Sequence, residues 1–350
     1  MKYFYSLILV FFVFKTYSQQ PDPLISDDII LQKKWVDSIF SSITLEEKIG
    51  QLFIPMVFSN RDSSHLRKTI ELIRKNNIGG IIFSKGLPKS QIEWSNILQS
   101  KSKIPLLISM DAEWGVAMRL KNVLSFPWNM TLGAINDDIL IFDIGKSIGE
   151  QLVRLGIHLN FAPVLDINTN PNNPIIGNRS FGESSKIVSN QSLHLMKGMQ
   201  SVNILTSGKH FPGHGDTSKD SHKTLPTVRF SKNRIKEVEL GPYKTLIEKG
   251  LSSVMIAHLN IPSIQDKELP TTLSKSVVTD LLINELGFNG LIFTDALDMK
   301  GVAGVKNVGN IDLAAFLAGN DILLMSENIS EGINSIQKAY LSGKISEERL

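Results

Sequence analysis

The fold depends on the stretch Ile204-Leu205-Thr206-Ser207-Gly208-Lys209-His210-Phe211-Pro212-Gly213-His214-Gly215-Asp216. Its first four residues form a short, mildly apolar run, as is typical of the end of a buried strand. Gly213 and Gly215 then allow the backbone to turn sharply. The residues that follow show neither the helical nor the strand spacing of apolar side chains. We therefore predict a polar loop at a strand end, where catalytic groups often lie. A solvated surface loop with incidental histidines is the alternative interpretation.

Further short apolar runs surround this one, and amphipathic stretches separate them. The eight runs are Leu52–Phe58, Gly80–Phe83, Pro105–Met110, Leu159–Leu165, Ile204–Ser207, Ser253–His258, Gly290–Thr294 and Asp321–Met325. The helix-like stretches include Ser64–Lys75, Ile139–Leu155, Lys186–Val202, Lys232–Lys249 and Ser276–Leu286. Eight βα units in this order predict an α/β fold, a single-domain (β/α)8 TIM-type barrel. An open doubly wound sheet is the alternative, but it has no reason to stop at eight strands.

Polar residues gather where the apolar runs end, which supports the barrel. They are Asp111 and Glu113, Asp166 and Asn168, Lys209 and His210, His258 and Asn260, and Asp295 and Asp298. In a barrel the carboxyl ends of all strands open onto one face, and that face holds the active site.

The N-terminal segment predicts export of the protein. A positive start at Lys2, an apolar run over Tyr3–Phe14 and small residues before Gln19 are typical of a signal peptide cleaved after Ser18. An uncleaved anchor is the alternative, although this run is shorter than the ~20 residues of a membrane span. We therefore expect a signal peptide at 1–18, a tether at 19–34, a barrel domain at 35–350 and a periplasmic or secreted mature protein.

The amino-acid composition argues against several kinds of site and partner. The chain of 350 residues has no cysteine, which excludes disulfides, cysteine-ligated metals and a lipid anchor at the cleavage site. The net charge of +3 is small, and no basic block is interleaved with aromatic residues, so nucleic acid is not an expected partner.

Two short patterns mark helix starts. Thr44-Leu45-Glu46-Glu47 is a capping box that begins a helix ending near Gln51. Residues 342–350 have the pattern of a capped helix start within which the chain stops. We therefore expect that the C-terminal end is truncated or that a further domain belongs to the parent chain.

At this point the chain resembles the β-N-acetylglucosaminidases of glycoside hydrolase family 3, from about Trp35 to Leu350. The most specific match is Lys209–Gly215 together with Asp220-Ser221-His222. Further matches are Trp35-Val36-Asp37, Thr44–Phe53, Asn160–Asp166, Asn178–Gly182 and Phe293–Met299. The Asp-Ser-His loop separates these enzymes from the family's β-glucosidases, which take their acid from a second domain.

One motif departs from the family. The family commonly has Gln-Glu-Gly-Gly-Arg after the aspartate that matches Asp111, whereas this chain has Ala112-Glu113-Trp114-Gly115-Val116. Val116 therefore replaces the arginine of the motif, although Arg119 keeps its place. Trp114 adds an aromatic side chain that we expect to affect a neighbouring sugar subsite.

The resemblance implies a retaining exo-glycosidase, whose chemistry needs a nucleophile and a proton donor on opposite faces of the sugar. Asp295 follows the seventh apolar run and matches the family's nucleophile; a buried helix-capping aspartate is the alternative, and Asp298 suits that role better. The resemblance makes His222 the acid/base, because histidine titrates near neutrality. Asp220 would orient its ring and stabilise the imidazolium.

The resemblance also implies the residues that bind the sugar in the −1 subsite. These are Asp111, Arg119, Arg179, Lys209 and His210. A structural ion pair is the alternative for each arginine. A zinc site from His210, His214, Asp216 and His222 matches no zinc spacing, so no metal and no cofactor are expected.

The expected substrate is a terminal β-linked N-acetylglucosaminide, with muropeptides from peptidoglycan as the fitting source and chitin oligomers as the alternative. Water is the expected acceptor, and phosphate remains an alternative. A glycan-binding barrel inactivated by truncation, a metal-dependent hydrolase and a β-glucosidase of the same family are the competing functions.

Overall fold

Parallel strands alternate with helices in the computed structural model, which describes residues 24–26, 28–217, 224–265, 269–303, 305 and 309–350. The strands are β1 (Phe53–Ile54), β2 (Met56–Val57), β3 (Gly80–Phe83), β4 (Leu107–Met110), β5 (Leu159–Asn160), β6 (Leu205–Phe211), β7 (Ser253–Ile256), β8 (Leu291–Thr294) and β9 (Leu323–Leu324). Each predicted apolar run contains or overlaps a strand. The first run contains two, because Pro55 has no N–H to donate to a ladder and separates β1 from β2. The run Ile204–Ser207 continues as β6 to Phe211, so Lys209 and His210 lie in the strand and not in the predicted loop.

The strands form a curled parallel sheet. β2 to β8 pair in chain order as one seven-stranded sheet, and β1 pairs with β9. A bridge between Phe293 of β8 and Ile322, next to β9, connects the two sheets on one side. On the other side only Pro55 separates β1 from β2. The predicted α/β class with a barrel-like parallel sheet is therefore confirmed.

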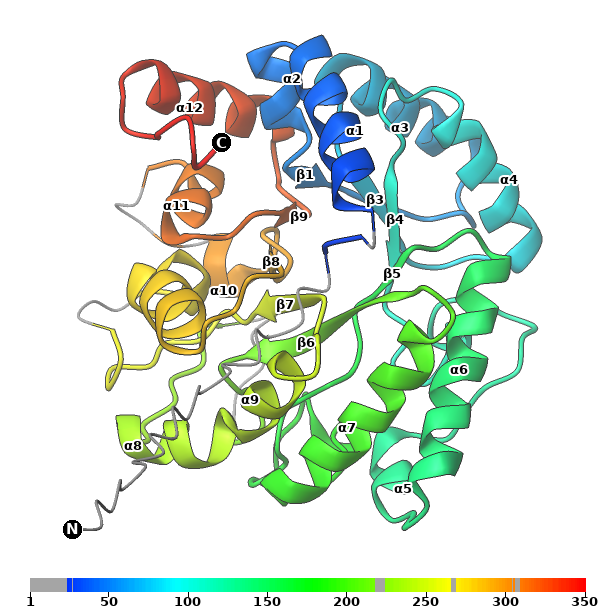
Figure 1. Ribbon diagram of the computed structural model, residues 1–350, viewed down its shortest axis with the longest axis vertical. Helices are drawn as coiled ribbons and strands as arrows, with labels where there is room; N and C mark the ends of the chain where they lie inside the picture. Colours follow the sequence, from blue (N-terminus) through cyan, green and yellow to red (C-terminus); the bar gives the residue numbers. More distant parts are fainter. Residues whose placement is uncertain (1–23, 27, 218–223, 266–268, 304, 306–308) are drawn as a thin grey trace, which may run out of the picture.

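Helices follow the strands and cover the outside of the sheet (Figure 1). The α-helices are α1 (Ile29–Ser42), α2 (Leu45–Gly50), α3 (Ser63–Asn76), α4 (Pro88–Gln99), α5 (Asn129–Gly133), α6 (Asp138–Arg154), α7 (Ser185–Gln200), α8 (Lys232–Arg234), α9 (Gly241–Ile247), α10 (Lys300–Ala303), α11 (Ile311–Ala318) and α12 (Ile329–Leu341). Three 3₁₀ turns, η1 (Val116–Met118), η2 (Gly177–Arg179) and η4 (Thr271–Leu273), and two π-helical segments, η3 (Ile235–Glu239) and η5 (Ser276–Glu285), complete the elements. All five predicted helical stretches are helical.

The interior of the curled sheet is packed with side chains from strands on opposite sides. The buried cluster comprises Ile54, Ile82, Leu159, Phe161, Met255, Phe293 and Leu324. The rings of Phe161 and Phe293 meet edge to face with centroids 5.2 Å apart. These side chains form a packed apolar layer beneath the carboxyl ends of the strands.

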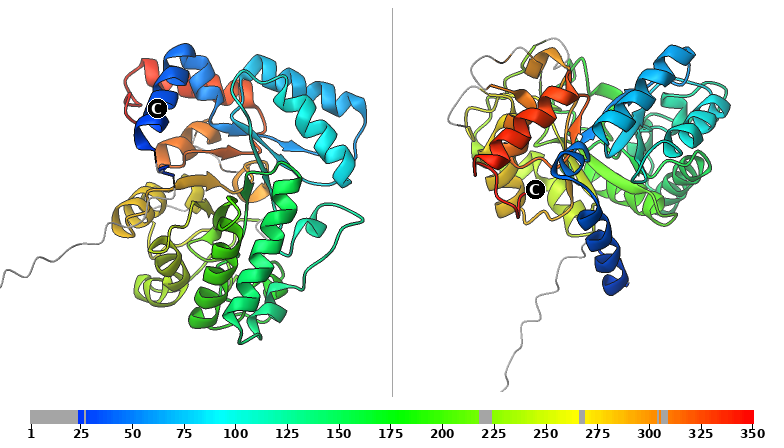
Figure 2. Two further views of the ribbon diagram at one scale, coloured as in Figure 1. Left: turned by 45° about the vertical axis from the view of Figure 1, so that its right-hand side comes forward. Right: turned by 90° about the horizontal axis from the view of Figure 1, so that it is seen from above.

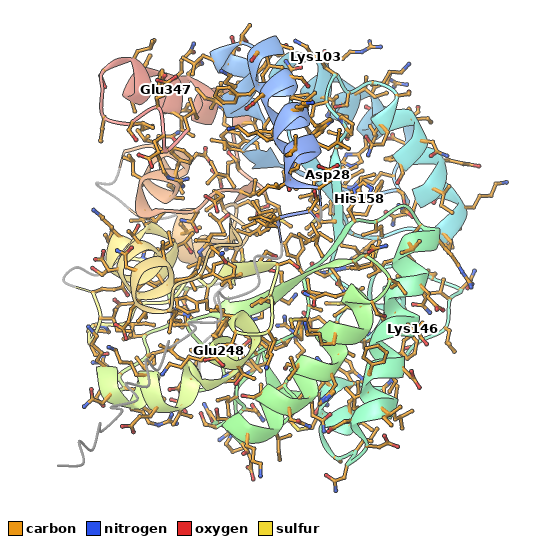
Figure 3. The ribbon with its side chains drawn as sticks, viewed as in Figure 1. Asp28, Lys103, Lys146, His158, Glu248 and Glu347 are labelled. Carbon is orange, nitrogen blue, oxygen red and sulfur yellow. The ribbon has the colours of Figure 1, made fainter. Side chains whose placement is uncertain are left out.

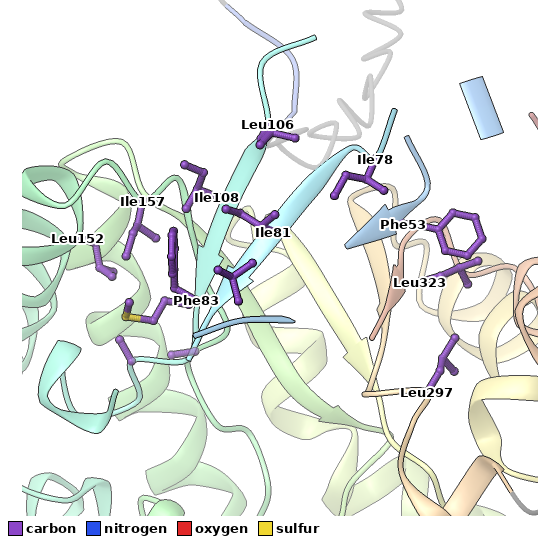
Figure 4. Close-up of a cluster of buried hydrophobic side chains, with 14 of the residues drawn as sticks. Phe53, Ile78, Ile81, Phe83, Leu106, Ile108, Leu152, Ile157, Leu297 and Leu323 are labelled. Carbon is purple, nitrogen blue, oxygen red and sulfur yellow. The ribbon is translucent and has the colours of Figure 1, made fainter. Parts of the chain in front are cut away.

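A larger apolar cluster lies between the sheet and its helices (Figure 4). Ile81 and Phe83 of β3 belong to this outer cluster, whereas Ile82 between them belongs to the inner one. Successive strand residues point to opposite faces, so a continuous apolar run serves both layers. Charged side chains such as Lys103, Lys146 and Glu347 lie on the outer surface (Figure 3).

At the N-terminal end, the predicted capping box is present, but a helix lies where a tether was expected. The capping box at Thr44 is present: the Thr44 hydroxyl accepts from the Glu47 N–H at 3.2 Å, and the Glu47 carboxylate accepts from the Thr44 N–H at 2.8 Å. Helix α1 begins at Ile29, inside the segment 19–34 expected to be a tether, because the Asp28 carboxylate caps it. α1 buries no residue and projects from the rest of the protein (Figure 2).

The C-terminal residues differ from the expected helix start. After α12, residues 342–350 form turns, although Ser346 accepts from the Arg349 N–H as an N-cap would. One further backbone bond, from Leu350 N to Ser346 O, makes only a single turn, which is too little to nucleate a helix. Within the described ranges, no helix combines the length and apolar character required to cross a membrane.

Candidate active site

A cavity of about 310 Å³ lies at the carboxyl ends of the strands. Six predicted site residues line it together: Asp111, Arg119, Arg179, Lys209, His210 and Asp295. Apolar side chains such as Ile82, Met255 and Leu324 come from the interior layer below and form part of the same wall. The cavity volume is at the lower end of the range for small-molecule sites.

Strand β6 contributes two neighbouring residues, Lys209 and His210, to this one cavity. In a regular strand, successive side chains point to opposite faces. The pairing of β6 with β7 shifts register between Gly208 and Phe211, and this irregularity interrupts the alternation. The Pro-Gly-rich sequence after β6 thus accompanies a local distortion that brings both polar groups to the site.

Lys209 is the buried cation at the centre of the polar cluster. It is 2% exposed, and its Nζ lies 2.8 Å from Asp111 Oδ1 and 2.7 Å from Glu113 Oε1. Arg119 donates to the other oxygen of Asp111. Burial alone would raise the pKa of Asp111, but the charges of Lys209 and Arg119 outweigh it and lower this pKa to about 2. Asp111 is therefore ionised and can accept from sugar hydroxyls.

Arg179 and Glu113 form a two-bonded pair in the wall of the cavity. Arg179 Nε donates to Glu113 Oε2 at 2.9 Å, and Arg179 Nη2 donates to Glu113 Oε1 at 2.7 Å. Burial opposes ionisation of Glu113, yet the charges of Arg179 and Lys209 lower the pKa of this carboxyl. The pair holds the guanidinium in a fixed plane.

Asp166 organises the two histidines on either side of the Phe-Pro-Gly turn. It is fully buried, and its Oδ2 accepts from His210 Nδ1 at 2.6 Å while its Oδ1 accepts from the His214 N–H at 2.6 Å. Arg179 Nη2 lies 3.2 Å from His210 Nε2. An arginine can only donate, so Nε2 is the acceptor of this contact and Nδ1 is the ring nitrogen that donates to Asp166.

His214 is also part of the cavity wall. Its Nδ1 lies 2.6 Å from the Thr217 hydroxyl, and burial lowers its pKa to about 4. The imidazole is therefore neutral at pH 7 next to a site that already holds three cations.

Asp295 directly follows β8, and the sheet fixes its backbone. Its N–H donates to Ile256 O at 2.9 Å, and its Oδ1 accepts from the Ala296 N–H at 2.8 Å. The buried His258 donates through Nε2 to Ala296 O at 2.9 Å, which anchors the next peptide. Asp295 thus lines the same cavity as the polar cluster from the ends of β4 and β6.

The other two predicted catalytic residues, Asp220 and His222, lie outside the described residues. Three residues that the sequence interpretation left out of its candidate site, Glu113, Asp166 and His214, belong to the polar cluster. Only their positions in the sequence indicate Glu113 and Asp166 as site residues, since both lie just after an apolar run. Their ion-pair partners are distant in sequence, so nothing local identified their contacts.

Comparison with known proteins places this geometry in a family. The chain belongs to glycosyl hydrolase family 3, because residues 44–350 match the model of the glycosyl hydrolase family 3 N-terminal domain. The predicted family resemblance is thereby confirmed.

The relatives give this assignment more detail. Beta-hexosaminidase A of Pseudoalteromonas piscicida is 37% identical over 279 residues, which cover 73% of this chain and 47% of that protein. A protein of Cellulomonas fimi named beta-N-acetylglucosaminidase/beta-glucosidase is 28% identical over 325 residues, covering 90% of this chain and 57% of that protein.

A solved structure agrees with both relatives. The family 3 beta-N-acetylglucosaminidase from Paenibacillus sp. str. FPU-7 superposes with a TM-score of 0.82 at 38% identity, covering 88% of this chain and 60% of that one. The chain thus spans about half to three-fifths of the length of these relatives.

Proposed function

We propose that the chain is a retaining exo-β-N-acetylglucosaminidase that hydrolyses terminal β-linked N-acetylglucosamine. The observation that carries the proposal is the cavity that Asp295 lines together with Asp111, Lys209, Arg179 and His210. This cluster supplies an ionised acceptor and several fixed donors, the set of groups that sugar hydroxyls and an acetamido oxygen require. The names of the relatives support the same substrate class.

In this proposal Asp295 is the nucleophile. Its carboxylate would attack the anomeric carbon, form a glycosyl ester and displace the aglycone oxygen. His222 would give its proton to that oxygen and then take one from the incoming water. Asp220 would orient the imidazole and stabilise its charged form, as the aspartate of a triad does. Because this donor is an imidazole rather than a carboxylic acid, it suits substrates that bear carboxylates near the scissile bond.

The source of the substrate is also a proposal. A signal peptide at 1–18 would deliver the enzyme to the periplasm or the medium, where muropeptides from peptidoglycan are available. Chitin fragments carry the same terminal sugar. Release of N-acetylglucosamine from purified muropeptides, compared with release from chitobiose, would rank the two sources.

A chromogenic assay tests the activity. The chain should release nitrophenolate from 4-nitrophenyl N-acetyl-β-glucosaminide, at a rate that a chelator leaves unchanged. A chain that binds this glycoside without cleaving it would be a glycan-binding barrel, and loss of activity with chelator would indicate a metal-dependent hydrolase.

Hydrolysis of the β-glucoside is the second candidate function, because the Cellulomonas fimi relative carries both names. Parallel assays on 4-nitrophenyl β-glucoside decide between the sugars. Repeating both assays with phosphate and analysing for a sugar 1-phosphate decides between water and phosphate as acceptor.

A further inference from the structure

Two tryptophans stack on each other beside the candidate active site. The indole rings of Trp114 and Trp128 have centroids 4.1 Å apart and an interplanar angle of 35°. Trp114 is half-buried, whereas Trp128 remains 44% exposed although Trp114 covers part of it. A large aromatic surface is therefore available to a ligand.

The loop 114–128 holds this pair in a defined position. The Phe126 N–H donates to Trp114 O at 3.3 Å, so the two ends of the loop are tied together. Gly115 has φ of +85°, and a Cβ on it would lie 2.7 Å from Phe126 Cδ2, so the close approach of Phe126 requires glycine. The Val116 N–H donates to Gln151 Oε1 of α6 at 3.3 Å, which fixes the loop to the helical layer.

The pair is connected to the cavity wall through Arg179. Trp114 directly follows Glu113, which binds the Arg179 guanidinium through two hydrogen bonds. Trp128 directly precedes Asn129, whose Nδ2 donates to Arg179 O at 2.7 Å. Both tryptophans thus adjoin residues that hold Arg179, and the side chain of Arg179 lines the cavity. Trp114 therefore directly follows a residue of the cavity wall, Glu113, and Trp128 stacks on Trp114.

We propose that the Trp114–Trp128 pair is a platform for a second pyranose unit of the substrate, beyond the unit held in the cavity. This inference rests on the proposed function. The faces of a pyranose carry C–H groups with partial positive charge, and the face of an indole carries negative charge, so the two stack favourably. The cavity of about 310 Å³ is a site for a single sugar, which leaves the adjoining unit of a longer glycan at its rim. Trp128 provides the contact surface, and Trp114 supports it from behind.

Two variants of exposed tryptophans test the platform. Trp128→Ala removes the contact surface, and Trp35→Ala removes an equally large side chain that is 55% exposed on α1. For each protein, kcat/KM is measured on chitotriose and on methyl N-acetyl-β-glucosaminide, which has no second sugar and no aromatic aglycone. Trp128→Ala should lower the ratio of the two kcat/KM values, chitotriose over methyl glycoside, at least about tenfold. Trp35→Ala should leave the ratio at the parent value, and Trp128→Phe should restore most of it.

An unchanged ratio in Trp128→Ala, or an equal fall in Trp35→Ala, would overturn the platform. If the parent cleaves neither substrate, the proposed function fails while the platform remains testable by calorimetric titration with chitotriose. Weaker binding to Trp128→Ala than to the parent would then support the platform. Equal binding to both proteins, or no binding to the parent at millimolar chitotriose, would overturn it.

Discussion

The ammonium group of Lys209 lies 2.8 Å from Asp111 Oδ1, and both side chains are largely removed from water. A buried charge is tolerated only where its partners compensate for lost hydration. Here Lys209 also contacts Glu113 at 2.7 Å, so one ammonium group joins two carboxylates, each of which also has an arginine partner. The cluster is therefore both a binding surface and a determinant of stability.

Replacing Lys209 by methionine should destabilise the protein. The substitution keeps the apolar stem but leaves Asp111 and Glu113 with one arginine partner each. Removing one member of a buried ion pair costs about 3–5 kcal/mol, and the remaining arginines place this case near about 3 kcal/mol. Urea denaturation measures the loss. The matched double variant Lys209→Met/Glu113→Gln should recover part of it. A loss below about 1 kcal/mol would show that the cluster is not a coupled unit.

Replacing His222 by alanine should affect substrates according to their leaving group. A nitrophenolate departs with little help from a proton, whereas a sugar alkoxide does not. General acid catalysis contributes about 10²–10⁴-fold, and this loss should fall mainly on chitobiose rather than on the nitrophenyl glycoside. Asp220→Asn should show a weaker form of the same pattern, because the imidazole remains without its orienting partner. Equal losses on both substrates would assign His222 to binding or structure instead.

Much of this arrangement was predictable from the chain, because strand ends in a barrel converge. The apolar runs gave the positions of β3, β4, β7 and β8, and the polar residues after them gave Asp111 and Asp295. The contacts among the polar side chains were not predictable. Asp166 holds His210 across 44 positions of the sequence, and the pairing of the neighbouring strands β5 and β6 brings them together.

The contact between Trp114 and Trp128 is likewise not predictable from the sequence. Trp114 departs from the family motif, but Trp128 lies 14 residues further along the chain and carries no local signal. Phe126 and Gly115 meet at a distance too short for any other residue than glycine at position 115, and this contact folds the loop back on itself. Such loop geometry depends on packing rather than on periodicity.

Replacing Asp312 by asparagine should flatten the pH dependence of stability. Asp312, at the start of α11, is 6% exposed, and burial raises its pKa to about 6, with Glu331 and Glu327 adding to the effect against the Ser326 hydrogen bond. In the unfolded chain its pKa is about 3.9. The folded protein thus binds the proton more tightly, and the resulting stabilisation is complete below about pH 4 and lost as pH rises through about 6.

The Asp312→Asn variant should therefore be more stable than the parent at pH 7, by about 1–3 kcal/mol, and similar to it at pH 4. Melting temperatures across pH 4–7 measure this, with the exposed Asp143→Asn as the matched control. Parallel pH profiles for the parent and Asp312→Asn would contradict the assignment.

The mature protein should begin at Gln19. The charged start, the apolar run over residues 3–14 and the small residues at 16 and 18 together motivate this expectation. N-terminal sequencing of protein isolated from the periplasm or medium of the native host measures the cleavage site. A sequence that starts at Met1 would show that the segment is retained.

The identity of the nucleophile is the most direct test of the proposed mechanism. A 5-fluoro derivative of N-acetylglucosaminyl fluoride, which forms the glycosyl ester faster than water removes it, should label the protein once. Peptide mapping by mass spectrometry should place the label on Asp295, and Asp295→Asn should remain unlabelled and inactive while melting at the parent temperature. A label on another residue, or turnover by Asp295→Asn within about tenfold of the parent, a barrier change of only about 1.4 kcal/mol, would contradict the mechanism.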